Sequence, residues 1–342
     1  MQNNENSKIR IAVSGVGGGV GQSVIKALQG TNYEVVCLDG EPLGAGLYAG
    51  SKSYIIPYAS NPDYLERVLD ICKAEDCKLF FPGLDAELPI LSRSVDRFTE
   101  IGTQVIVSRP EVVDLSDNKS LTALQLAEAG VSVPQTIDMD DQAVDTPPLP
   151  FPFVLKVKIG GARSQGLHVI KNEDDWQSIK SLKHDFGNYV AQEYIDGDEY
   201  TCGTVNLDNE CKGVIVMRRI LRDGDTYKCF SVKDPVIETE VRKVVEAIKP
   251  FGACNVQLRV RDGKPYIFEI NARCSGTTAA RALCGFNEPK MIADFLLAAE
   301  EPSYEIIEQS ILRYWKELVV PNSQIETIRD EGVLSQDSPL SL

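Results

Sequence analysis

Histidine is almost absent from this sequence, with only His168 and His184 among 342 residues. The sequence therefore has too few histidines for a histidine-rich metal site and hardly enough for a histidine-based catalytic triad. The nine cysteines are scattered and form no Cys-x-x-Cys pair, so nothing signals a zinc ribbon or a thioredoxin-like motif. We interpret them as reduced thiols in a cytoplasmic protein. Any chemistry must then use lysine, arginine, carboxylate and amide side chains.

Long apolar runs and an excess of basic charge are also missing. No stretch of roughly 18 apolar residues occurs and the N-terminus lacks an apolar segment, so we expect neither a membrane span nor a secretory signal. The 35 basic and 50 acidic residues give a net charge of −15, which argues against a general nucleic-acid binder. A small anionic ligand is still compatible with this charge, because local geometry can concentrate a few cations.

Strand and helix patterns alternate along the first part of the chain. Short apolar segments at 10–14 and 78–81 predict strands, whereas the apolar periodicity at 22–29 and 64–74 predicts helices. This alternation predicts an α/β domain with a parallel sheet and helices on both faces. We expect this Rossmann-like domain to comprise residues 1–114.

Beyond this domain the pattern changes. Ser116–Asp117 can cap a helix that runs to about Ala129. After an Asp- and Pro-rich connector at 138–152, apolar strands with hairpin-like turns follow, with few helices between them. This half is predicted to be α+β with mainly antiparallel sheets. We expect the last residues, 330–342, to fray.

A glycine-rich turn, Gly15–Gly21, follows the first strand and opens the next helix. Glycines let the backbone approach a phosphate, which the helix N-terminus attracts. The strict Gly-x-Gly-x-x-Gly form fails, but the Gly-x-x-x-Gly-x-Gly form of short-chain dehydrogenases fits at positions 15, 19 and 21. Asp39 ends the next strand, where a ribose-binding acid would lie. The turn is compatible with NAD, with a substrate, or with no ligand.

A hairpin is predicted over Cys254–Arg273, with Asp262–Gly263 at its turn. Apolar residues occupy even-numbered positions on both strands. Directly paired numbers must therefore sum to an even value, which predicts a loop of three or five residues. In this register Gln257, Glu269 and Asn271 project from one face.

These polar residues suit a cation and a phosphate. A carboxylate beside an amide oxygen is suitable material for a hard divalent cation, and Arg273 follows on the same side, where it could meet a phosphate. Glu269 taken alone fits an ordinary half-exposed hairpin. The alternation of acid, amide and arginine favours a site.

Two further segments carry polar groups of interest. Lys156 lies inside an apolar strand, where an unpaired lysine is costly, and the Gly-rich loop at 160–166 could close over phosphates. A solvated edge lysine and a simple hairpin turn explain the same residues equally well. Glu199 begins a strand after the turn at Asp196–Gly197, and it is either a ribose-binding acid or a surface acid.

The order of these elements resembles the ATP-grasp superfamily: a lysine near a helix start, a lysine with a Gly-rich loop, QEYIDGDEYT, and a hairpin ending in EINAR. Over about residues 8–320 the chain is most similar to the carbamoyl-phosphate-synthase-large-subunit branch, which includes a pyrrolysine-biosynthesis ligase. The resemblance implies a pre-ATP-grasp domain over 1–114 and a small ATP-grasp subdomain, the nucleotide lid, over 115–190. It implies a large subdomain with the metal and catalytic face over 191–320, and a C-terminal tail over 321–342.

The resemblance also implies an ATP site and a metal site. Nucleotide contacts would come from two lysines, the phosphate-covering loop, the adenine hinge and the ribose-binding acid: Lys119, Lys156, Gly160, Gly161, Ser164, Gly166, Glu193, Tyr194, Ile195 and Glu199. Mg²⁺ or Mn²⁺ would bind at Gln257, Glu269 and Asn271, although many members carry an acid in place of the glutamine. Arg273, Lys156 and Asn271 would be catalytic, with Arg273 on the transferred phosphate.

The acceptor pocket draws on the N-terminal domain and on variable loops in this branch. Candidates to line it are Asp85, Glu87 and Ser275, and each also fits a structural role. Further substrate candidates are Arg219, Gly17 and Gly18. Arg218 and Arg222 are alternatives to Arg219, and all three arginines fit a solvated strand end equally well.

The function that the resemblance implies is an ADP-forming, ATP-dependent carboxylate–amine ligase, with ATP and Mg²⁺ between the two subdomains. Phosphorylation of a carboxylate gives an acyl phosphate that an amine attacks, and this needs positioned charge more than a histidine. Two alternatives stay open: carboxyphosphate or carbamate phosphorylation, and an NAD-dependent oxidoreductase or nucleotide-binding regulatory module that uses Gly15–Gly21. The partners would be small carboxylates and amines, and the resemblance is compatible with a homodimer.

Overall fold

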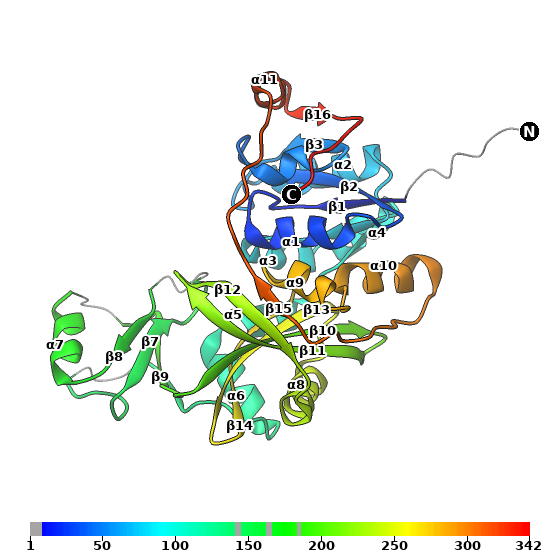
Figure 1. The fold of residues 1–342 in the computed structure, drawn as a ribbon. Helices are drawn as coiled ribbons and strands as arrows, with labels where there is room; N and C mark the ends of the chain where they lie inside the picture. The colour runs from blue at the N-terminus through cyan, green and yellow to red at the C-terminus, as the bar shows by residue number, and fades with distance from the viewer. Residues whose placement is uncertain (1–8, 141–144, 162–165, 183–185) are drawn as a thin grey trace, which may run out of the picture.

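The computed structural model describes residues 9–140, 145–161, 166–182 and 186–342. Its N-terminal part is a sheet in the order β16-β3-β2-β1-β4-β5, in which β1 to β5 run parallel (Figure 1). The strands are β1 (Ile9–Val13), β2 (Tyr33–Asp39), β3 (Lys52–Ile55), β4 (Leu79–Phe81), β5 (Gln104–Val105) and β16 (Val333–Ser335). The helices between them are α1 (Gly19–Leu28), η1 (Ala45–Tyr48), α2 (Tyr64–Ala74), η2 (Asp85–Glu87), α3 (Leu88–Ser92) and α4 (Val95–Glu100).

Helices cover both faces of this parallel sheet. Ile11 and Val13 of β1 are buried in one core with Val24 of α1, whereas Ala12 is buried in a second core with Val68 of α2. Successive side chains of a strand point to opposite faces, so a fully apolar strand needs a helix on each side. The predicted α/β fold with a parallel sheet is confirmed for this part of the chain.

The end of the chain returns to the N-terminal sheet, so the expectation that residues 330–342 fray was wrong. α11 (Asn322–Glu331) is followed by β16, which pairs antiparallel with β3 through Leu334 and Ser53 (Figure 1). Ile328 and Leu334 are buried in the N-terminal core. The segment is too short to show its own periodicity, and its strand partner comes from a distant part of the chain.

A second six-stranded sheet, in the order β14-β13-β10-β11-β12-β15, is antiparallel throughout. Its strands are β10 (Asp198–Leu207), β11 (Glu210–Arg222), β12 (Asp225–Val232), β13 (Gly252–Arg261), β14 (Lys264–Asn271) and β15 (Ser310–Leu312). One face packs on α8 (Pro235–Ile248), and α9 (Thr278–Leu283) and α10 (Glu288–Ala298) lie between the other face and the N-terminal domain (Figure 1).

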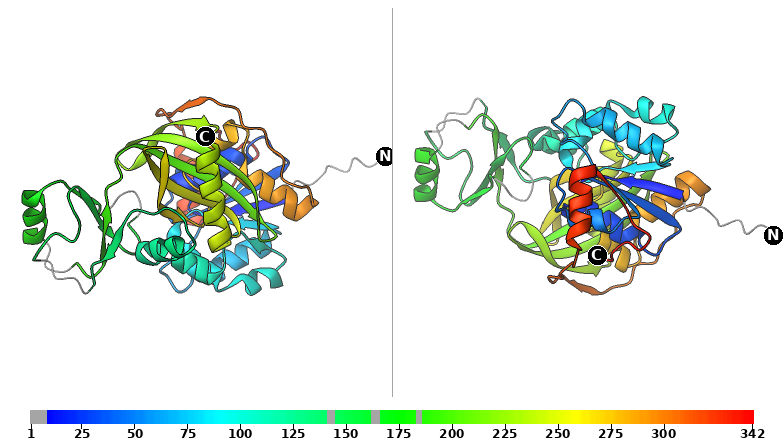
Figure 2. Two further views of the ribbon diagram at one scale, coloured as in Figure 1. Left: turned by 90° about the horizontal axis from the view of Figure 1, so that it is seen from below. Right: turned by 90° about the horizontal axis from the view of Figure 1, so that it is seen from above.

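A smaller sheet, in the order β6-β9-β7-β8, forms a lobe with α7 that projects away from the rest of the molecule (Figure 2). Its elements are β6 (Thr136–Asp138), β7 (Phe153–Val157), β8 (His168–Ile170), α7 (Glu173–Leu182) and β9 (Tyr189–Glu193). All strand pairs of this sheet are antiparallel, so the α+β prediction for the second half is confirmed.

Two helices replace the single helix expected to start at Ser116–Asp117. α5 (Pro110–Asp117) ends where α6 (Lys119–Glu128) begins, and Asn118 accepts hydrogen bonds from two backbone N–H groups of α6. Asn118 is therefore the N-cap, a role for which a short amide side chain is well suited. This cap places Lys119 at the first helical position, facing the small lobe.

The β13–β14 hairpin has a two-residue turn, so the prediction of an odd loop was wrong. Arg261 pairs with Lys264, and Asp262 and Gly263 both adopt positive φ angles, 53° and 75°. This is the geometry of a type I′ turn. A register shift next to Gln257 inserts Phe268 as an extra residue, and this bulge restores the predicted alignment beyond it. Glu269 therefore still lies opposite Gln257.

Candidate active site

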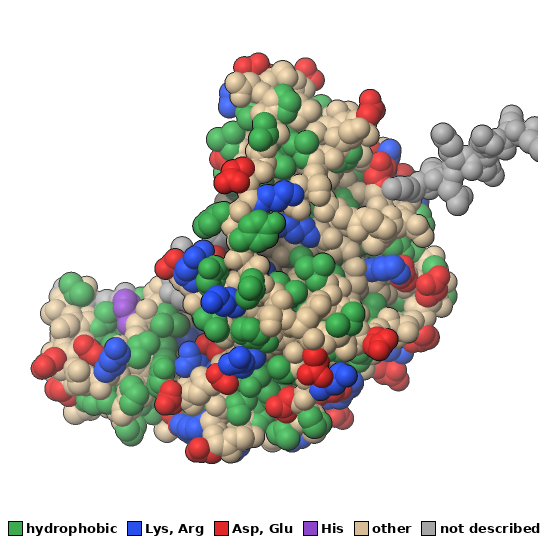
Figure 3. All heavy atoms as spheres, in the orientation of Figure 1, with side chains coloured by type: hydrophobic (Ala, Val, Ile, Leu, Met, Phe, Trp, Pro, Cys, Tyr) green, Lys and Arg blue, Asp and Glu red, His purple; other side chains and the backbone are tan. Residues whose placement is uncertain are grey.

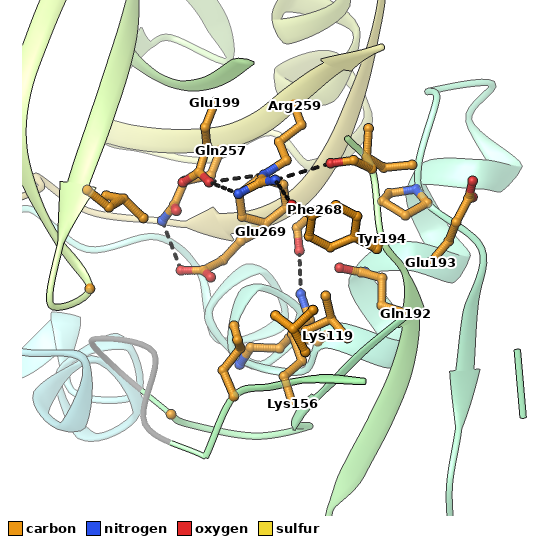
Figure 4. A pocket seen from close by; sticks show the side chains of 18 of the residues that line it. Lys119, Lys156, Gln192, Glu193, Tyr194, Glu199, Gln257, Arg259, Phe268 and Glu269 are labelled. Carbon is orange, nitrogen blue, oxygen red and sulfur yellow. Dashed lines mark hydrogen bonds and ion pairs between the residues drawn. The ribbon is translucent and has the colours of Figure 1, made fainter. Parts of the chain in front are cut away.

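A cavity of about 270 Å³ lies between the small lobe and the large antiparallel sheet (Figure 4). The small lobe and α6 supply Lys119, Lys156 and the segment Gln192–Ile195, while the large sheet supplies the opposite wall. The residues of that wall are Glu199, Arg219, Leu221, Gln257, Arg259, Phe268 and Glu269. The cavity therefore brings together most of the residues that the resemblance assigned to a nucleotide.

The segment expected to hold adenine runs along one end of this cavity. Ile195 is buried, and its carbonyl oxygen accepts a hydrogen bond of 3.2 Å from Arg259, which also donates to the Tyr194 hydroxyl at 3.2 Å. Glu193 forms an ion pair with Arg261. Apolar side chains of the small lobe, including Val154, Val157 and Leu167, line the same cavity. This end offers apolar contact and backbone polar groups together, as a planar base requires.

Glu199, the predicted ribose-binding acid, lies between two arginines. Arg219 donates to its Oε1 at 2.6 Å and Arg259 donates to its Oε2 at 2.8 Å. The register of the sheet explains this, because Glu199 of β10 pairs directly with Arg219 of β11 and with Arg259 of β13. The sequence analysis did not identify Arg259 as a residue of this site. Because Arg259 is two positions from Gln257 on the same strand, the alternation could have placed both side chains on one face.

Lys156 and Lys119 enter the cavity from the side opposite Glu199 (Figure 4). The Lys156 side chain is buried, and its ammonium group donates to the Phe268 carbonyl oxygen at 3.0 Å. Burial lowers the pKa of Lys156 to about 8; the charge of Glu269 opposes this shift, and that of Lys119 adds to it. No carboxylate of the described residues forms an ion pair with this buried ammonium, so it should attract an anion strongly.

The Gly-rich loop begins beside Lys119. The Lys119 ammonium donates to the Gly160 carbonyl oxygen at 2.6 Å, and the Gly160 N–H donates to Asp117 at 3.0 Å. Gly160, Gly161 and Gly166 all have positive φ angles, which glycine adopts without strain. Ser164 lies outside the described residues.

Glu269 is the centre of the polar face predicted on the hairpin. Gln257 and Asn271 both donate to its Oε1, at 2.9 and 3.1 Å. Among the described residues no group of three or more histidine, cysteine, aspartate and glutamate side chains could hold a metal ion. The donor set is therefore one carboxylate with two amides, all oxygen donors of the kind that Mg²⁺ accepts. It fits a Mg²⁺ that keeps several of its ligands from water and phosphate.

Arg273 leaves this face and reaches the N-terminal domain. Its guanidinium forms a bidentate ion pair with Asp85, at 2.7 and 2.6 Å, and also donates to Asn271 at 3.3 Å. Burial alone would raise the pKa of Asp85, but Arg273 and Lys119 lower it below its usual range. Asp85 of this pair lines a second cavity of about 70 Å³, together with Asp117, Lys119, Glu269 and Asn271 among others.

The other acceptor candidates lie apart from these cavities. Glu87 is buried beneath the glycine turn, where the hydroxyls of Ser14 and Tyr64 donate to it. Burial raises the pKa of Glu87 to about 7, although these hydrogen bonds oppose the shift. Ser275 is also buried, and its hydroxyl lies 2.7 Å from that of Thr277.

The glycine turn itself is occupied by a neighbouring carboxylate. Gly17 donates its N–H to one oxygen of the Asp39 carboxylate at 2.6 Å, and the backbone N–H of Glu41 donates to the other oxygen at 2.9 Å. Gly18 is the N-cap of α1, and its N–H is bonded to the Gly15 carbonyl oxygen. Asp39 therefore stabilises the turn, and in this conformation it is not free for a ribose. The interaction argues against the dehydrogenase alternative.

Two family models match separate parts of the chain. The model described as the PylC-like N-terminal domain matches residues 11–106, and the model described as ATP-grasp in the biosynthetic pathway with Ter operon matches residues 185–317. The recognition of the ATP-grasp superfamily, and of a pyrrolysine-biosynthesis-like N-terminal domain, is thereby confirmed.

Among the described residues, no helix is both long and apolar enough to cross a membrane.

Curated proteins and a solved structure extend this picture. A carbamoyl phosphate synthase large chain of Pseudothermotoga lettingae is 22% identical over 315 residues, which cover 84% of this chain but only 27% of the larger protein. A D-alanine–D-alanine ligase A of Bacillus cereus is 28% identical over 45% of this chain and 56% of that protein. The biotin carboxylase domain dimer of Hydrogenobacter thermophilus 2-oxoglutarate carboxylase, with MgADP and bicarbonate, has a TM-score of 0.67 at 17% identity, covering 87% of this chain and 71% of that one.

Proposed function

We propose that this chain, which belongs to the ATP-grasp superfamily, is an ADP-forming carboxylate–amine ligase that works through an acyl phosphate. The observation that carries the proposal is the cavity between the lobes, where Lys119 and Lys156 stand opposite Glu269. Cations and a metal-binding carboxylate placed on opposite sides of one cavity are what a triphosphate needs. The solved neighbour that holds MgADP and bicarbonate supports the same use of the fold.

ATP would lie along the cavity with its base at Glu193–Ile195. Glu199 would accept hydrogen bonds from the ribose, and its two arginine partners hold the carboxylate in place. Lys156 would hold the α- and β-phosphates, and Lys119 would reach the same region from the start of α6. Gly160, Gly161 and Gly166 belong to the loop that would cover the phosphates and exclude water from the reactive intermediate.

Mg²⁺ would be held by Glu269, with Asn271 and Gln257 as amide ligands. When bound it neutralises charge on the phosphate oxygens. In the structure both amides donate N–H groups to Glu269, and their oxygen atoms accept from arginines, that of Gln257 from Arg219 and that of Asn271 from Arg273. To meet a cation, these oxygens would have to exchange an arginine for the metal. With one carboxylate in the set, we expect Mn²⁺ to substitute for Mg²⁺.

The chemical steps would take place where the two cavities meet, near Arg273. An oxygen of the substrate carboxylate attacks the γ-phosphorus, the bond to the β-phosphate oxygen breaks, and ADP leaves. The amine nitrogen then attacks the acyl carbon, phosphate departs, and the nitrogen loses a proton. Arg273 would stabilise the transferred phosphate. Asp85 holds its guanidinium in place from the N-terminal domain.

Carboxyphosphate or carbamate phosphorylation is a second candidate function, favoured by the likeness to carbamoyl phosphate synthase large chains. The small second cavity suits bicarbonate or ammonia as well as a larger substrate that opens it. One assay separates the two. ADP release is measured with a library of amino acids and small carboxylates, and separately with bicarbonate and ammonia. Release that requires an organic acid and an amine supports the ligase. Carbamoyl phosphate formed from bicarbonate and ammonia supports the alternative.

A homodimer is also part of the proposal, since the biotin carboxylase domain among the neighbours is described as a dimer. Light scattering on the purified chain tests it directly: a mass twice the 37.6 kDa of one chain is expected. A mass of one chain at micromolar concentration would contradict it.

A further inference from the structure

Arg313 is a partly buried arginine that forms no ion pair within the described part of the chain. It follows β15, and its side chain donates to the Gly276 carbonyl oxygen. Burial lowers the pKa of Arg313, and although Asp225 is near enough to oppose this shift, no carboxylate of the described residues lies within ion-pair distance of it. An arginine has five N–H donors, and the other nitrogens of this guanidinium make no hydrogen bond to the described residues. Unused donors on a desolvated cation are costly unless a ligand takes them.

Two lysines stand beside this arginine. Burial of part of its side chain lowers the pKa of Lys26 of α1, and the charges of Arg313 and Lys316 are near enough to lower it further. No ion pair is formed by Lys26 or Lys316 with the described part of the chain, and Lys316 donates only to the Ser341 carbonyl oxygen, at 3.2 Å. Three unpaired cations thus gather on a chain whose net charge is −15. Mutual repulsion of this kind is relieved by an anion.

The backbone is open at two glycines near these cations. A Cβ atom built at Gly276 meets nothing within 4 Å, and the same holds at Gly19 in the first turn of α1. Gly19, Ser23 and Lys26 share one face of α1, and the Ser23 hydroxyl donates to the Gly276 carbonyl oxygen at 2.9 Å. Figure 3 shows basic side chains around a recess between the N-terminal domain and the antiparallel sheet.

The recess is also close to the reacting groups. Gly276 is three residues beyond Arg273, so their backbones lie within roughly 11 Å of each other. A substrate of a few bonds could place its reacting carboxylate near Arg273 and another group beside Gly276. The three arginines considered as substrate contacts are engaged elsewhere: Arg219 with Glu199, Arg218 with Asp198, and Arg222 over the Tyr227 ring.

We propose that Arg313, with Lys26 and Lys316, binds a second anionic group, a carboxylate or a phosphate, on the substrate of the ligase. This inference rests on the proposed function for the reaction, but the anion site can be tested without turnover. The substrate class is then an acid or amine with an additional anionic end. Simple monocarboxylic amino acids would be poor substrates.

The test measures the melting temperature of the full chain with millimolar succinate, inorganic phosphate or acetate. We expect succinate or phosphate to raise the melting temperature of the natural protein by at least about 2 °C, and acetate to have little effect. Stabilisation by succinate alone identifies a carboxylate end, and stabilisation by phosphate alone identifies a phosphate end. No shift with either dianion would overturn the proposal.

Variants decide whether the shift comes from this recess. Arg313→Gln should lose it, Lys26→Gln at an exposed position should weaken it, and Arg93→Gln, at an exposed position of the N-terminal domain, is the matched control that should keep it. An equal shift in Arg313→Gln and the control would overturn the proposal. If Arg313→Gln does not fold, the same melting-temperature shift is measured in Lys26→Gln and Arg313→Lys, and a shift in Lys26→Gln equal to that of the control would overturn the proposal. AMPPNP with Mg²⁺, added to the same variants, tests the nucleotide site. Its failure to stabilise any of them counts against the proposed function alone.

Discussion

Arg273 and Asp85 lie 188 residues apart in the chain, and they form a bidentate ion pair with N–O distances of 2.7 and 2.6 Å. Arg273 follows the polar hairpin of the large sheet, while Asp85 follows β4 of the parallel sheet. The pair therefore joins the N-terminal domain to the proposed catalytic face. The N-terminal domain thus holds the guanidinium of Arg273 in place through Asp85, and Asp85 also lines the second cavity.

Removing the carboxylate from this pair should affect turnover more than nucleotide binding. In Asp85→Asn the guanidinium loses its charged partner and is held less firmly, so we expect kcat to fall by about tenfold. The Kd for ADP should change less than about twofold, because Asp85 does not line the nucleotide cavity. Asp114→Asn, which removes an exposed ion pair with Arg93, is the control. A large loss of ADP affinity with unchanged kcat would contradict the assigned role.

Glu269 is the single carboxylate of the proposed metal site. Glu269→Gln should lower ATP turnover by at least about 100-fold, because the metal loses its charged ligand. Its circular dichroism spectrum should match that of the natural protein. Glu246→Gln, at an exposed position of α8, is the matched control. Unchanged ADP release in Glu269→Gln would refute the metal assignment.

Lys156 predicts a pH dependence of nucleotide affinity. Its pKa of about 8 means that the ammonium form, which binds phosphate, is lost as the pH rises through this value. Calorimetry with Mg²⁺–ADP should show affinity falling between pH 7 and pH 9. Lys156→Gln should bind more weakly and show no such fall, and Lys171→Gln, on the surface of the small lobe, should behave like the natural protein. The same fall in Lys156→Gln would assign it to another group.

Lys156 also predicts a trend in stability. Its ordinary pKa of 10.5 is lowered in the folded protein, so the unfolded chain binds more protons between about pH 8 and 10.5. The free energy of unfolding contributed by this group should therefore rise with pH across that window. Urea titrations of the natural protein and Lys156→Gln measure it as a difference. A difference that does not change between pH 8 and pH 10 would contradict the burial of the charge.

The raised pKa of Glu87 predicts that its contribution to the free energy of unfolding falls as the pH rises, at lower pH than for Lys156. Its pKa is raised from 4.5 to about 7, so the folded protein binds the proton more tightly, and stability is lost as the pH rises through this range. Glu87→Gln avoids the buried charge while keeping an oxygen for Ser14 and Tyr64. Its stability relative to the natural protein should improve from pH 5 to pH 8. The matched control is Glu111→Gln on the surface of α5, and equal pH trends in both variants would disprove the prediction.

The polar face of the hairpin could be predicted from the sequence because β-strand alternation has a period of two. Gln257, Glu269 and Asn271 lie together, although the turn has two residues and not an odd number. The bulge at Phe268 compensates for the error. A bulge leaves little trace in the order of polar and apolar residues, so only the structure reveals it.

Contacts between distant segments could not be predicted in this way. Asp85 and Arg273 belong to different domains, and Arg313 lies beyond the motifs that carry the resemblance. The packing of α11 and β16 against the N-terminal sheet could not be predicted for the same reason, because it joins segments that are far apart in the sequence. Local periodicity reports which face of an element is apolar, but not which distant element covers it.

The most direct measurement is a crystal structure of the full chain with AMPPNP and Mg²⁺. The account predicts adenine at Glu193–Ile195, phosphates beside Lys119 and Lys156, and the metal on Glu269. A nucleotide bound instead at Gly15–Gly21, or a metal that leaves Glu269 uncoordinated, would contradict it.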